Sequence, residues 1–76
     1  MNKKLYELEI GKSATVDGLN AHSLLRDRLL ALGVTKGATI QVIRKGPKQN
    51  LTLYKIRGAM IALRKEEAST ITVSLL

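Results

Sequence analysis

The spacing of apolar residues changes near the middle of the chain. Before Gly33 the leucines recur at helical spacing, and after Gly37 apolar side chains occupy every second position, at Ala38, Ile40 and Val42. A period of 3.6 residues indicates a helix, and a period of two indicates a strand. Glycine suits the first position past a helix and the last position of a β-turn. The pattern therefore predicts a helix joined tightly to a strand.

The helix before this turn is predicted over about residues 21–32. Asn20 or Ser23 is expected to accept hydrogen bonds from the free backbone amides at its start. Its buried stripe consists of the leucines at positions i, i+4 and i+7, which are Leu25, Leu29 and Leu32.

Five strands are predicted around the helix. They are a short alternating segment through Ala14 and Val16 that ends at an Asp17-Gly18 turn, and residues 38–44, 51–56, 59–63 and 71–76. Residues 46–50 are expected to form a loop, Arg57-Gly58 a tight hairpin, and residues 65–69 one helical turn. Five strands and one helix in so short a chain predict a small, mainly β barrel, because closing the sheet hides its edges.

Length and composition limit the classes of protein. With 76 residues the chain is expected to form one domain over residues 1–76. It has no cysteine, which excludes disulfides and thiolate metal sites and fits a reducing cytoplasm. No stretch of about 18 apolar residues could span a membrane. We therefore expect a cytoplasmic protein.

Charge is the strongest compositional signal. Thirteen Lys and Arg against six Asp and Glu leave a formal net charge of +7, which favours nucleic acid, an anionic membrane surface or an acidic protein as partner. However, Tyr6 and Tyr54 are the only aromatic rings that could stack on bases. The basic residues are also spread from Lys3 to Lys65, which is typical of solvated faces. Nucleic acid is therefore not the favoured partner.

Motifs for catalysis are absent or incomplete. Gly11-Lys12-Ser13 resembles the end of a phosphate-binding loop, but position 6, where that loop needs a glycine, is Tyr6. His22 and Ser23 are neighbours on the predicted helix, where adjacent side chains point about 100° apart and do not face each other. We therefore predict that the chain is not an enzyme.

The candidate metal ligands have the wrong spacing. His22 and Asp27 are five positions apart, so they do not show the i, i+3 or i+4 spacing of a helical site, although Asp17, Glu66 and Glu67 could in principle join them. Glu66 and Glu67 are expected to begin or cap the last helical turn, where the helix dipole favours carboxylates. No metal or other cofactor is predicted.

An ordered set of motifs resembles the FeoA family, the ferrous iron transport protein A family. The motifs are Leu5-x-x-Leu8-x-x-Gly11, Arg28-Leu29-x-x-Leu32-Gly33-Val34-x-x-Gly37, Arg57-Gly58 and Leu63-Arg64-x-x-x-Ala68-x-x-Ile71-x-Val73. The resemblance covers nearly the whole chain. It departs from the usual pattern after Pro47, which is followed by Lys48-Gln49-Asn50-Leu51, whereas many relatives continue with glycine, aspartate and another proline.

The resemblance implies a five-stranded, Src-homology-3-like barrel with one main helix. It also implies a cytosolic accessory protein of ferrous iron uptake, acting on the cytosolic side of FeoB, a membrane transporter with a GTP-binding domain. The alternative left open by the charge is a small basic barrel that binds RNA or DNA. The oligomeric state is not predicted.

The helix offers one candidate docking surface. Around the predicted stripe, Leu24 and Leu30 lie far enough from Leu25 that one or both should face water. Our candidate for partner docking consists of Ser23, Leu24, Arg26 and Leu30, an apolar spot beside a positive charge. The alternative is that both leucines cover the open ends of the barrel.

Two further residues on apolar faces are assigned structural roles. Arg28 flanks the stripe, so its stem is expected to pack on the barrel while its head reaches a carbonyl or carboxylate. Met60 has a soft side chain that suits a contact point, but it lies in a hairpin of alternating apolar residues and is expected in the core.

Overall fold

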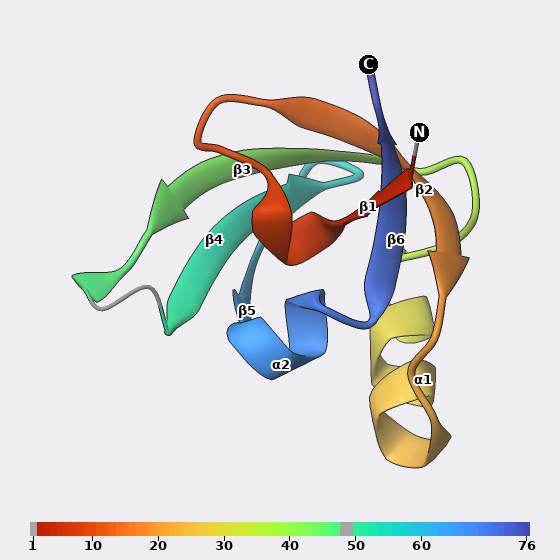
Figure 1. Ribbon diagram of the computed structural model, residues 1–76. Coiled ribbons are helices and arrows are strands. Elements are labelled where there is room, and N and C mark those ends of the chain that lie inside the picture. The colour runs from red at the N-terminus through yellow and green to blue at the C-terminus, as the bar shows by residue number, and fades with distance from the viewer. Residues whose placement is uncertain (1, 48–49) are drawn as a thin grey trace.

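Six strands form one antiparallel sheet in a computed structural model that describes residues 2–47 and 50–76 (Figure 1). The elements are β1 (Asn2–Lys4), the 3₁₀ helix η1 (Leu5–Glu7), β2 (Ser13–Leu19), α1 (Ser23–Ala31), β3 (Thr39–Lys45), β4 (Leu51–Ile56), β5 (Ala59–Arg64), α2 (Lys65–Ala68) and β6 (Ile71–Leu75). The strand order is β1-β6-β2-β3-β4-β5.

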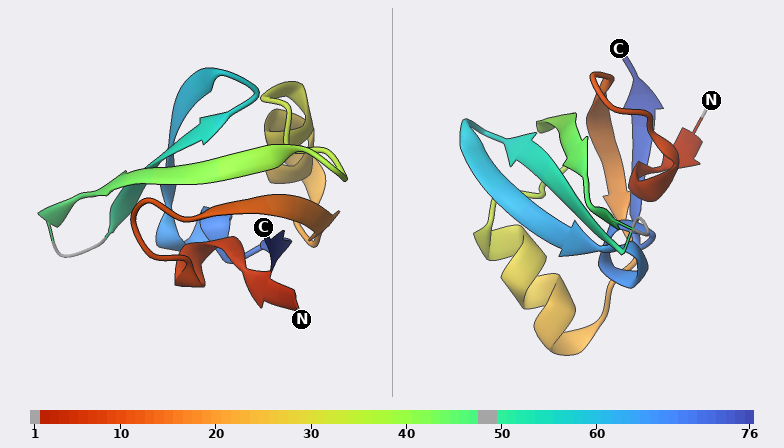
Figure 2. Two further views of the ribbon diagram at one scale, coloured as in Figure 1. Left: turned by 90° about the horizontal axis from the view of Figure 1, so that it is seen from above. Right: turned by 90° about the vertical axis from the view of Figure 1, so that its left-hand side faces the viewer.

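The sheet curls around one small core, as the two views in Figure 2 show. The largest fully buried side chains come from almost every element and include Leu5, Leu29, Ile40, Tyr54, Ile56, Leu63 and Ile71. This is the mainly β architecture with one main helix that the sequence predicts. However, β1 and β5 do not pair in the described part of the chain, so the sheet has two edges instead of closing fully.

The strand that the sequence analysis missed is β1. It pairs with β6, with Lys3 opposite Val73 and Lys4 opposite Thr72. Its short polar sequence carries no alternation of apolar residues, so nothing local marks it as a strand. The next three residues form η1 and bury Leu5.

The predicted turn at Asp17-Gly18 is wrong, because β2 continues to Leu19 through a β-bulge. The pairing with β6 shifts between Val16 and Gly18, which leaves Asp17 as the extra residue. The carboxylate of Asp17 accepts a hydrogen bond from the Ser74 hydroxyl. Gly18 does not adopt the positive φ that makes Asp-Gly a turn signal; a Cβ there would instead stand 3.1 Å from Thr72 Oγ1 on β6.

The junction between α1 and β3 follows the prediction closely. Val34 N–H donates to Leu29 O and Gly33 N–H to Leu30 O, each at 3.0 Å, which is the Schellman pattern of hydrogen bonds past a helix end. Gly33 has φ +98° and Gly37 φ +89°. The Ala38 N–H bonds to Thr35 O, so Gly37 is the third residue of the turn and not the last.

The start and the buried face of α1 differ from the prediction. The helix begins at Ser23, and the position before it is His22, whose side chain makes no capping bond. Asn20 lies two positions before the cap position and is part of the β2 ladder, where its N–H donates to Thr70 O at 2.7 Å. Of the predicted stripe, Leu29 is fully buried, whereas Leu25 and Leu32 are partly buried.

The β4–β5 hairpin is as tight as predicted. Ile56 pairs with Ala59, and the two residues between them have positive φ, +49° at Arg57 and +83° at Gly58. Two consecutive residues with positive φ define a type I′ turn, whose twist matches that of the strands. After β5 the chain forms the single turn of α2, as expected.

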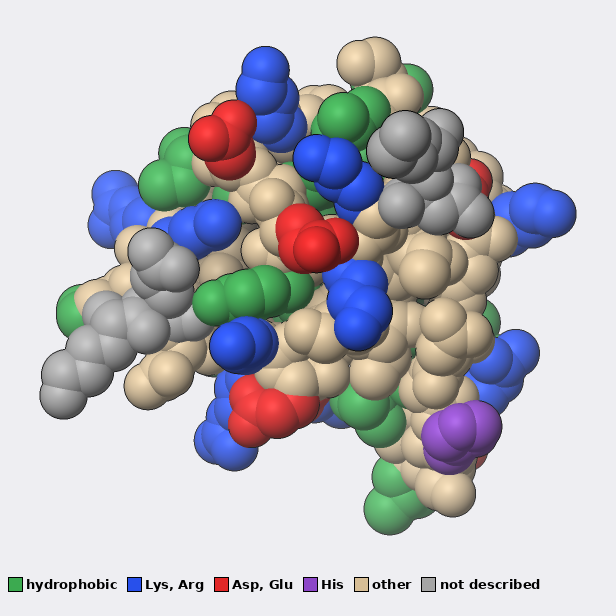
Figure 3. Space-filling model, viewed as in Figure 1, with side chains coloured by type: hydrophobic (Ala, Val, Ile, Leu, Met, Phe, Trp, Pro, Cys, Tyr) green, Lys and Arg blue, Asp and Glu red, His purple; other side chains and the backbone are tan. Residues whose placement is uncertain are grey.

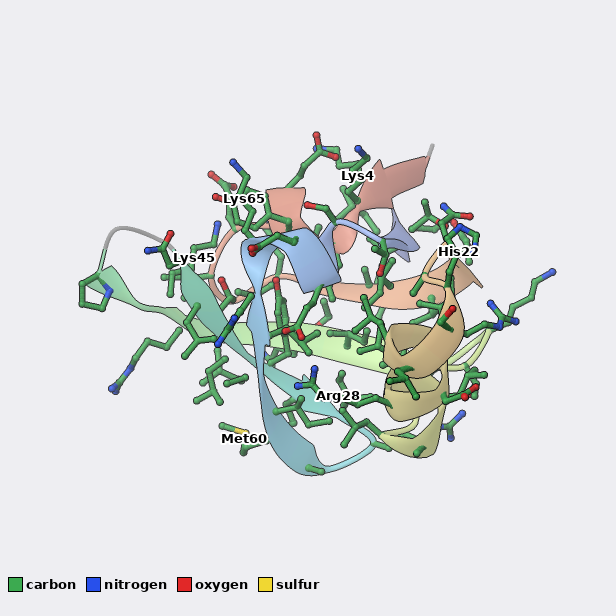
Figure 4. The ribbon with its side chains drawn as sticks, turned by 90° about the horizontal axis from the view of Figure 1, so that it is seen from below. Lys4, His22, Arg28, Lys45, Met60 and Lys65 are labelled. Atoms are coloured by element: carbon green, nitrogen blue, oxygen red, sulfur yellow. The ribbon has the colours of Figure 1, made fainter. Side chains whose placement is uncertain are left out.

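Met60 is not a core residue, so that prediction is wrong. Its side chain is 54% exposed and points out from β5 (Figure 4), while Leu63 is fully buried and Ile61 packs against the core. The alternation along β5 could place either set of alternate side chains inward, because both sets are largely apolar.

In the predicted loop, Gly46 N–H donates to Leu51 O at 2.7 Å. The divergent positions Lys48 and Gln49 lie outside the described residues.

Candidate docking surface

The candidate helix α1 lies at one end of the curled sheet, connected to it by its buried Leu29 and by two side-chain contacts (Figure 1). Arg28 Nη1 forms an ion pair with Glu67 Oε2 at 2.5 Å, which joins α1 to α2. Arg26 Nη1 donates to the Leu19 carbonyl at 3.1 Å, which joins the start of α1 to the end of β2. The helix therefore presents its remaining surface in a fixed orientation.

Arg28 has the structural role that we expected, with a carboxylate as its partner. Burial acts to raise the pKa of Glu67, but the N–H of Arg64 and the guanidinium of Arg28 outweigh this effect and hold the pKa below its ordinary value. Glu67 Oε1 accepts the Arg64 N–H at 2.8 Å, so Glu67 also caps α2, as the sequence predicts.

Both leucines of the candidate surface face water. Leu24 is 84% exposed and Leu30 is 37% exposed, and Ser23 and Arg26 are exposed as well. Ser23, Arg26 and Leu30 are spaced i, i+3 and i+7, so they follow one ridge of the helix. Leu24 lies about 160° around the helix from Arg26 by helical geometry and belongs to a different face. The structure thus brings together three of the four candidate residues.

A second apolar surface was missed by the sequence analysis. A groove of about 280 Å³ on the outside of the sheet is lined mainly by apolar groups, including Pro47, Leu51, Leu53 and Ala62. The signal was present in the sequence: β4 carries leucines at two alternate positions, and the other face of the strand carries Tyr54 and Ile56. A strand with apolar residues on both faces leaves one of them exposed when only one face meets a core.

Of the two tyrosines, Tyr54 is not available to stack on bases. Tyr54 is 1% exposed, and this burial raises its pKa to about 12. The ring of Tyr6 is partly buried, with Lys45 Nζ 5.8 Å and Lys65 Nζ 5.1 Å from its centroid. Figure 3 shows Lys and Arg side chains spread over the visible face, with acidic side chains between them, and not gathered in one groove.

The candidate metal ligands do not meet. Within residues 2–47 and 50–76 there is no group of three or more His, Asp or Glu side chains that could hold a metal ion. His22 is exposed before α1 (Figure 4).

The Gly11-Lys12-Ser13 motif does not form a phosphate-binding loop. Gly11 lies in a turn that leads into β2, whereas a phosphate-binding loop leads into a helix. In the described part of the chain, no helix is long and apolar enough to cross a membrane.

Comparison with known proteins identifies the family. The FeoA domain model matches residues 3–75. A Campylobacter jejuni relative of the Fe(2+) transport protein A type is 35% identical over 72 residues, covering 95% of this chain and 97% of the relative. A second relative, from Porphyromonas gingivalis, is an Fe(2+) transport protein A/Fe(2+) transporter FeoB fusion protein. It is 32% identical over 73 residues, which are 96% of this chain but 9% of the fusion protein.

A solved structure gives the same result. FeoA of Stenotrophomonas maltophilia, described as a prokaryotic SH3 domain protein and determined as a complex with zinc, superposes with a TM-score of 0.84 at 31% identity. The match covers 97% of this chain and 89% of that protein. Fold, motifs and relatives agree, and the chain belongs to the FeoA domain family, which is associated with ferrous iron transport.

Proposed function

We propose that the chain is a cytosolic accessory and regulatory protein of ferrous iron uptake that docks on the cytosolic side of a FeoB-type transporter. The observation that carries this proposal is the fusion protein of Porphyromonas gingivalis, in which a FeoA-like segment and FeoB share one polypeptide. Two domains fused in one organism are held together permanently, which supports association of the separate chains elsewhere. The proposal assigns the chain no reaction of its own.

The proposed contact is the ridge of α1 formed by Ser23, Arg26 and Leu30; Leu24, the fourth candidate, lies on a different face of the helix. An exposed leucine beside a guanidinium combines apolar area with a long-range positive charge. Leu24 is 84% exposed and Leu30 is 37% exposed, which supports docking over the alternative that both leucines cover the open ends of the barrel. Arg26 is positioned by its bond to Leu19 O, so little conformational entropy would be lost on binding.

Titration of the chain against the isolated cytosolic region of FeoB tests the proposal. We expect saturable binding that persists at physiological salt. The runner-up function, binding of RNA or DNA, predicts instead binding to arbitrary duplex DNA and single-stranded RNA that falls steeply with salt, because phosphate contacts release counterions. Binding to nucleic acid alone would overturn the transporter proposal in favour of the runner-up.

A further inference from the structure

The outward face of β3, β4 and β5 combines exposed apolar side chains with cations. In the strand pairing, each of its larger apolar residues lies directly opposite a cation: Leu51 opposite Arg64, Leu53 opposite Arg44 and Met60 opposite Lys55. Met60 is 54% exposed and Leu51 is 47% exposed, and Met60 points out from β5 in Figure 4. We call these side chains, together with the exposed Ala62 opposite Leu53, the outer β face.

The positive charge of the outer β face is largely uncompensated. With the other described residues, Arg44 and Lys55 form no ion pair. Arg64 is less available, because its N–H holds the Glu67 carboxylate nearby and Glu66 lines the same hollow as Arg64. None of the side chains of the outer β face is itself acidic. Electrostatic complementarity therefore requires an anionic partner.

The apolar groove on this face is small and is bordered by a cation. Its volume is about 280 Å³, and Arg44 lines it beside Leu53 and Ala62. Pockets that enclose a small molecule typically measure about 300–1,000 Å³. The outer β face is therefore better suited to contact with an extended surface than to enclosing a small ligand.

The placement of the cations favours a lipid bilayer over a protein as that surface. The core of a protein interface is depleted of charged residues, whereas each larger apolar side chain here lies opposite a cation. A bilayer with anionic lipids offers acyl chains and phosphates within one contact, so apolar side chains can enter it while Lys and Arg heads stay at the phosphates. A second copy of the chain, using the same face, would bring like charges together. The net charge of +7 adds a long-range attraction to an anionic membrane.

We propose that the outer β face binds peripherally to a bilayer that contains anionic lipids. Met60 and Leu51 would enter the boundary between headgroups and acyl chains, and Arg44 and Lys55 would contact the lipid phosphates. Because the exposed apolar area is small, binding is reversible and needs the apolar and the electrostatic contributions together. This contact is separate from the docking that we propose at α1, and it does not require a transporter.

Co-sedimentation of the intact chain with lipid vesicles tests the proposal. Vesicles of phosphatidylcholine mixed with phosphatidylglycerol supply the anionic surface, and vesicles of phosphatidylcholine alone are the comparison. We expect binding to the anionic vesicles that weakens as salt screens the attraction, and much weaker binding to the neutral ones. Equal binding to both kinds of vesicle, or none to the anionic kind, would overturn the proposal. Because the vesicles contain no transporter, that result would leave the docking proposal at α1 standing.

A matched pair of charge variants separates the outer β face from general attraction. Lys55→Gln and Lys3→Gln remove the same charge, the first from the outer β face and the second from β1 at the opposite edge of the sheet. We expect Lys55→Gln to weaken binding to the anionic vesicles about fivefold, the effect of one cation close to an anionic membrane. Lys3→Gln should weaken it clearly less. Equal weakening by the two variants would assign the binding to net charge and overturn the role of this face.

A tryptophan reporter measures entry of the outer β face into the bilayer. The chain has no Trp, so Met60→Trp and Leu24→Trp each introduce a single indole, in β5 and in α1. Both positions are largely exposed, so both variants should keep the melting temperature of the wild type. On anionic vesicles we expect the emission of Met60→Trp to move to shorter wavelength, because its indole leaves water, and that of Leu24→Trp to stay as in buffer. No shift for Met60→Trp, or an equal shift for Leu24→Trp, would overturn the proposal.

Discussion

Arg57, in the turn between β4 and β5, lies directly across Gly33 at the end of α1. Its Nε donates to the Gly33 carbonyl at 3.2 Å, and its Nη2 donates to Thr35 Oγ1 at 2.7 Å. A Cβ added at Gly33 would stand 2.9 Å from Arg57 Cδ. The Arg57 guanidinium thus holds the β4–β5 turn against the α1–β3 junction. Its closeness explains why position 33 needs a residue without a side chain.

Gly33→Ala should therefore destabilise the protein more than Gly37→Ala. Both positions have positive φ, which costs a residue with a Cβ roughly 1–2 kcal/mol. Only position 33 adds a clash, because a Cβ at Gly37 would meet no atom within 4 Å. Chemical denaturation of both variants gives the difference in the free energy of unfolding. Equal destabilisation would mean that Arg57 moves aside without cost.

Leu29→Ala tests whether the small core depends on α1. Leu29 is fully buried, and truncating such a leucine costs about 2–5 kcal/mol. Native stability is generally about 5–15 kcal/mol, and a small domain lies low in that range, so the variant is expected to be largely unfolded at moderate urea. Leu24→Ala, at an 84% exposed position of the same helix, should change the midpoint little. A wild-type midpoint for Leu29→Ala would contradict the packing of α1.

Local features of this fold could be predicted from the sequence because the residues that determine them are neighbours. The helix end at Gly33, the hairpin at Arg57-Gly58 and the cap by Glu67 each depend on a few consecutive residues. β1 could not be predicted in this way, because its pairing partner Val73 is far along the chain. The Asp17 bulge was missed for the same reason, since only the register against β6 distinguishes it from a turn.

The candidate surfaces show a similar limit. Helical spacing indicated that one or both of Leu24 and Leu30 face water, which is confirmed, but it did not show that Arg26 bonds to Leu19 O. The exposed Met60 was assigned to the core because both faces of its strand are apolar. Which face turns inward depends on the curl of the whole sheet, and no local pattern in β5 records it.

The stability of the protein should fall in acid partly through Glu67. Its pKa is held below the ordinary value in the folded state, so the unfolded chain binds the proton more readily and stability rises with pH through this range. The contribution is complete above the unfolded pKa, about 4.3, and is lost as pH falls through the lower folded pKa. Glu67→Gln should therefore lower the melting temperature at pH 7 and make a smaller difference near pH 3.

Glu66→Gln serves as the control for this effect, because it makes the same substitution at an exposed position of α2. Melting temperatures of the wild type and both variants, measured at several pH values, separate the two residues. If the difference between the wild type and Glu67→Gln were the same at pH 7 and pH 3, the ion pair with Arg28 and the cap of α2 would not depend on the charge of Glu67.

The docking surface on α1 predicts which substitutions weaken binding to the transporter. Leu30→Gln removes apolar contact area, and Arg26→Glu reverses a charge, so both should reduce affinity for the cytosolic region of FeoB. The effect of Arg26→Glu should be greater at low salt, where exposed charges are least screened.

Lys12→Glu is the control. It changes the net charge by the same amount as Arg26→Glu, but it lies at the other end of β2 from α1. Binding isotherms and melting curves of each variant are compared with those of the wild type. Unchanged binding by both helix variants would exclude this surface, and equal weakening by Lys12→Glu would reduce the effect of Arg26 to general electrostatics.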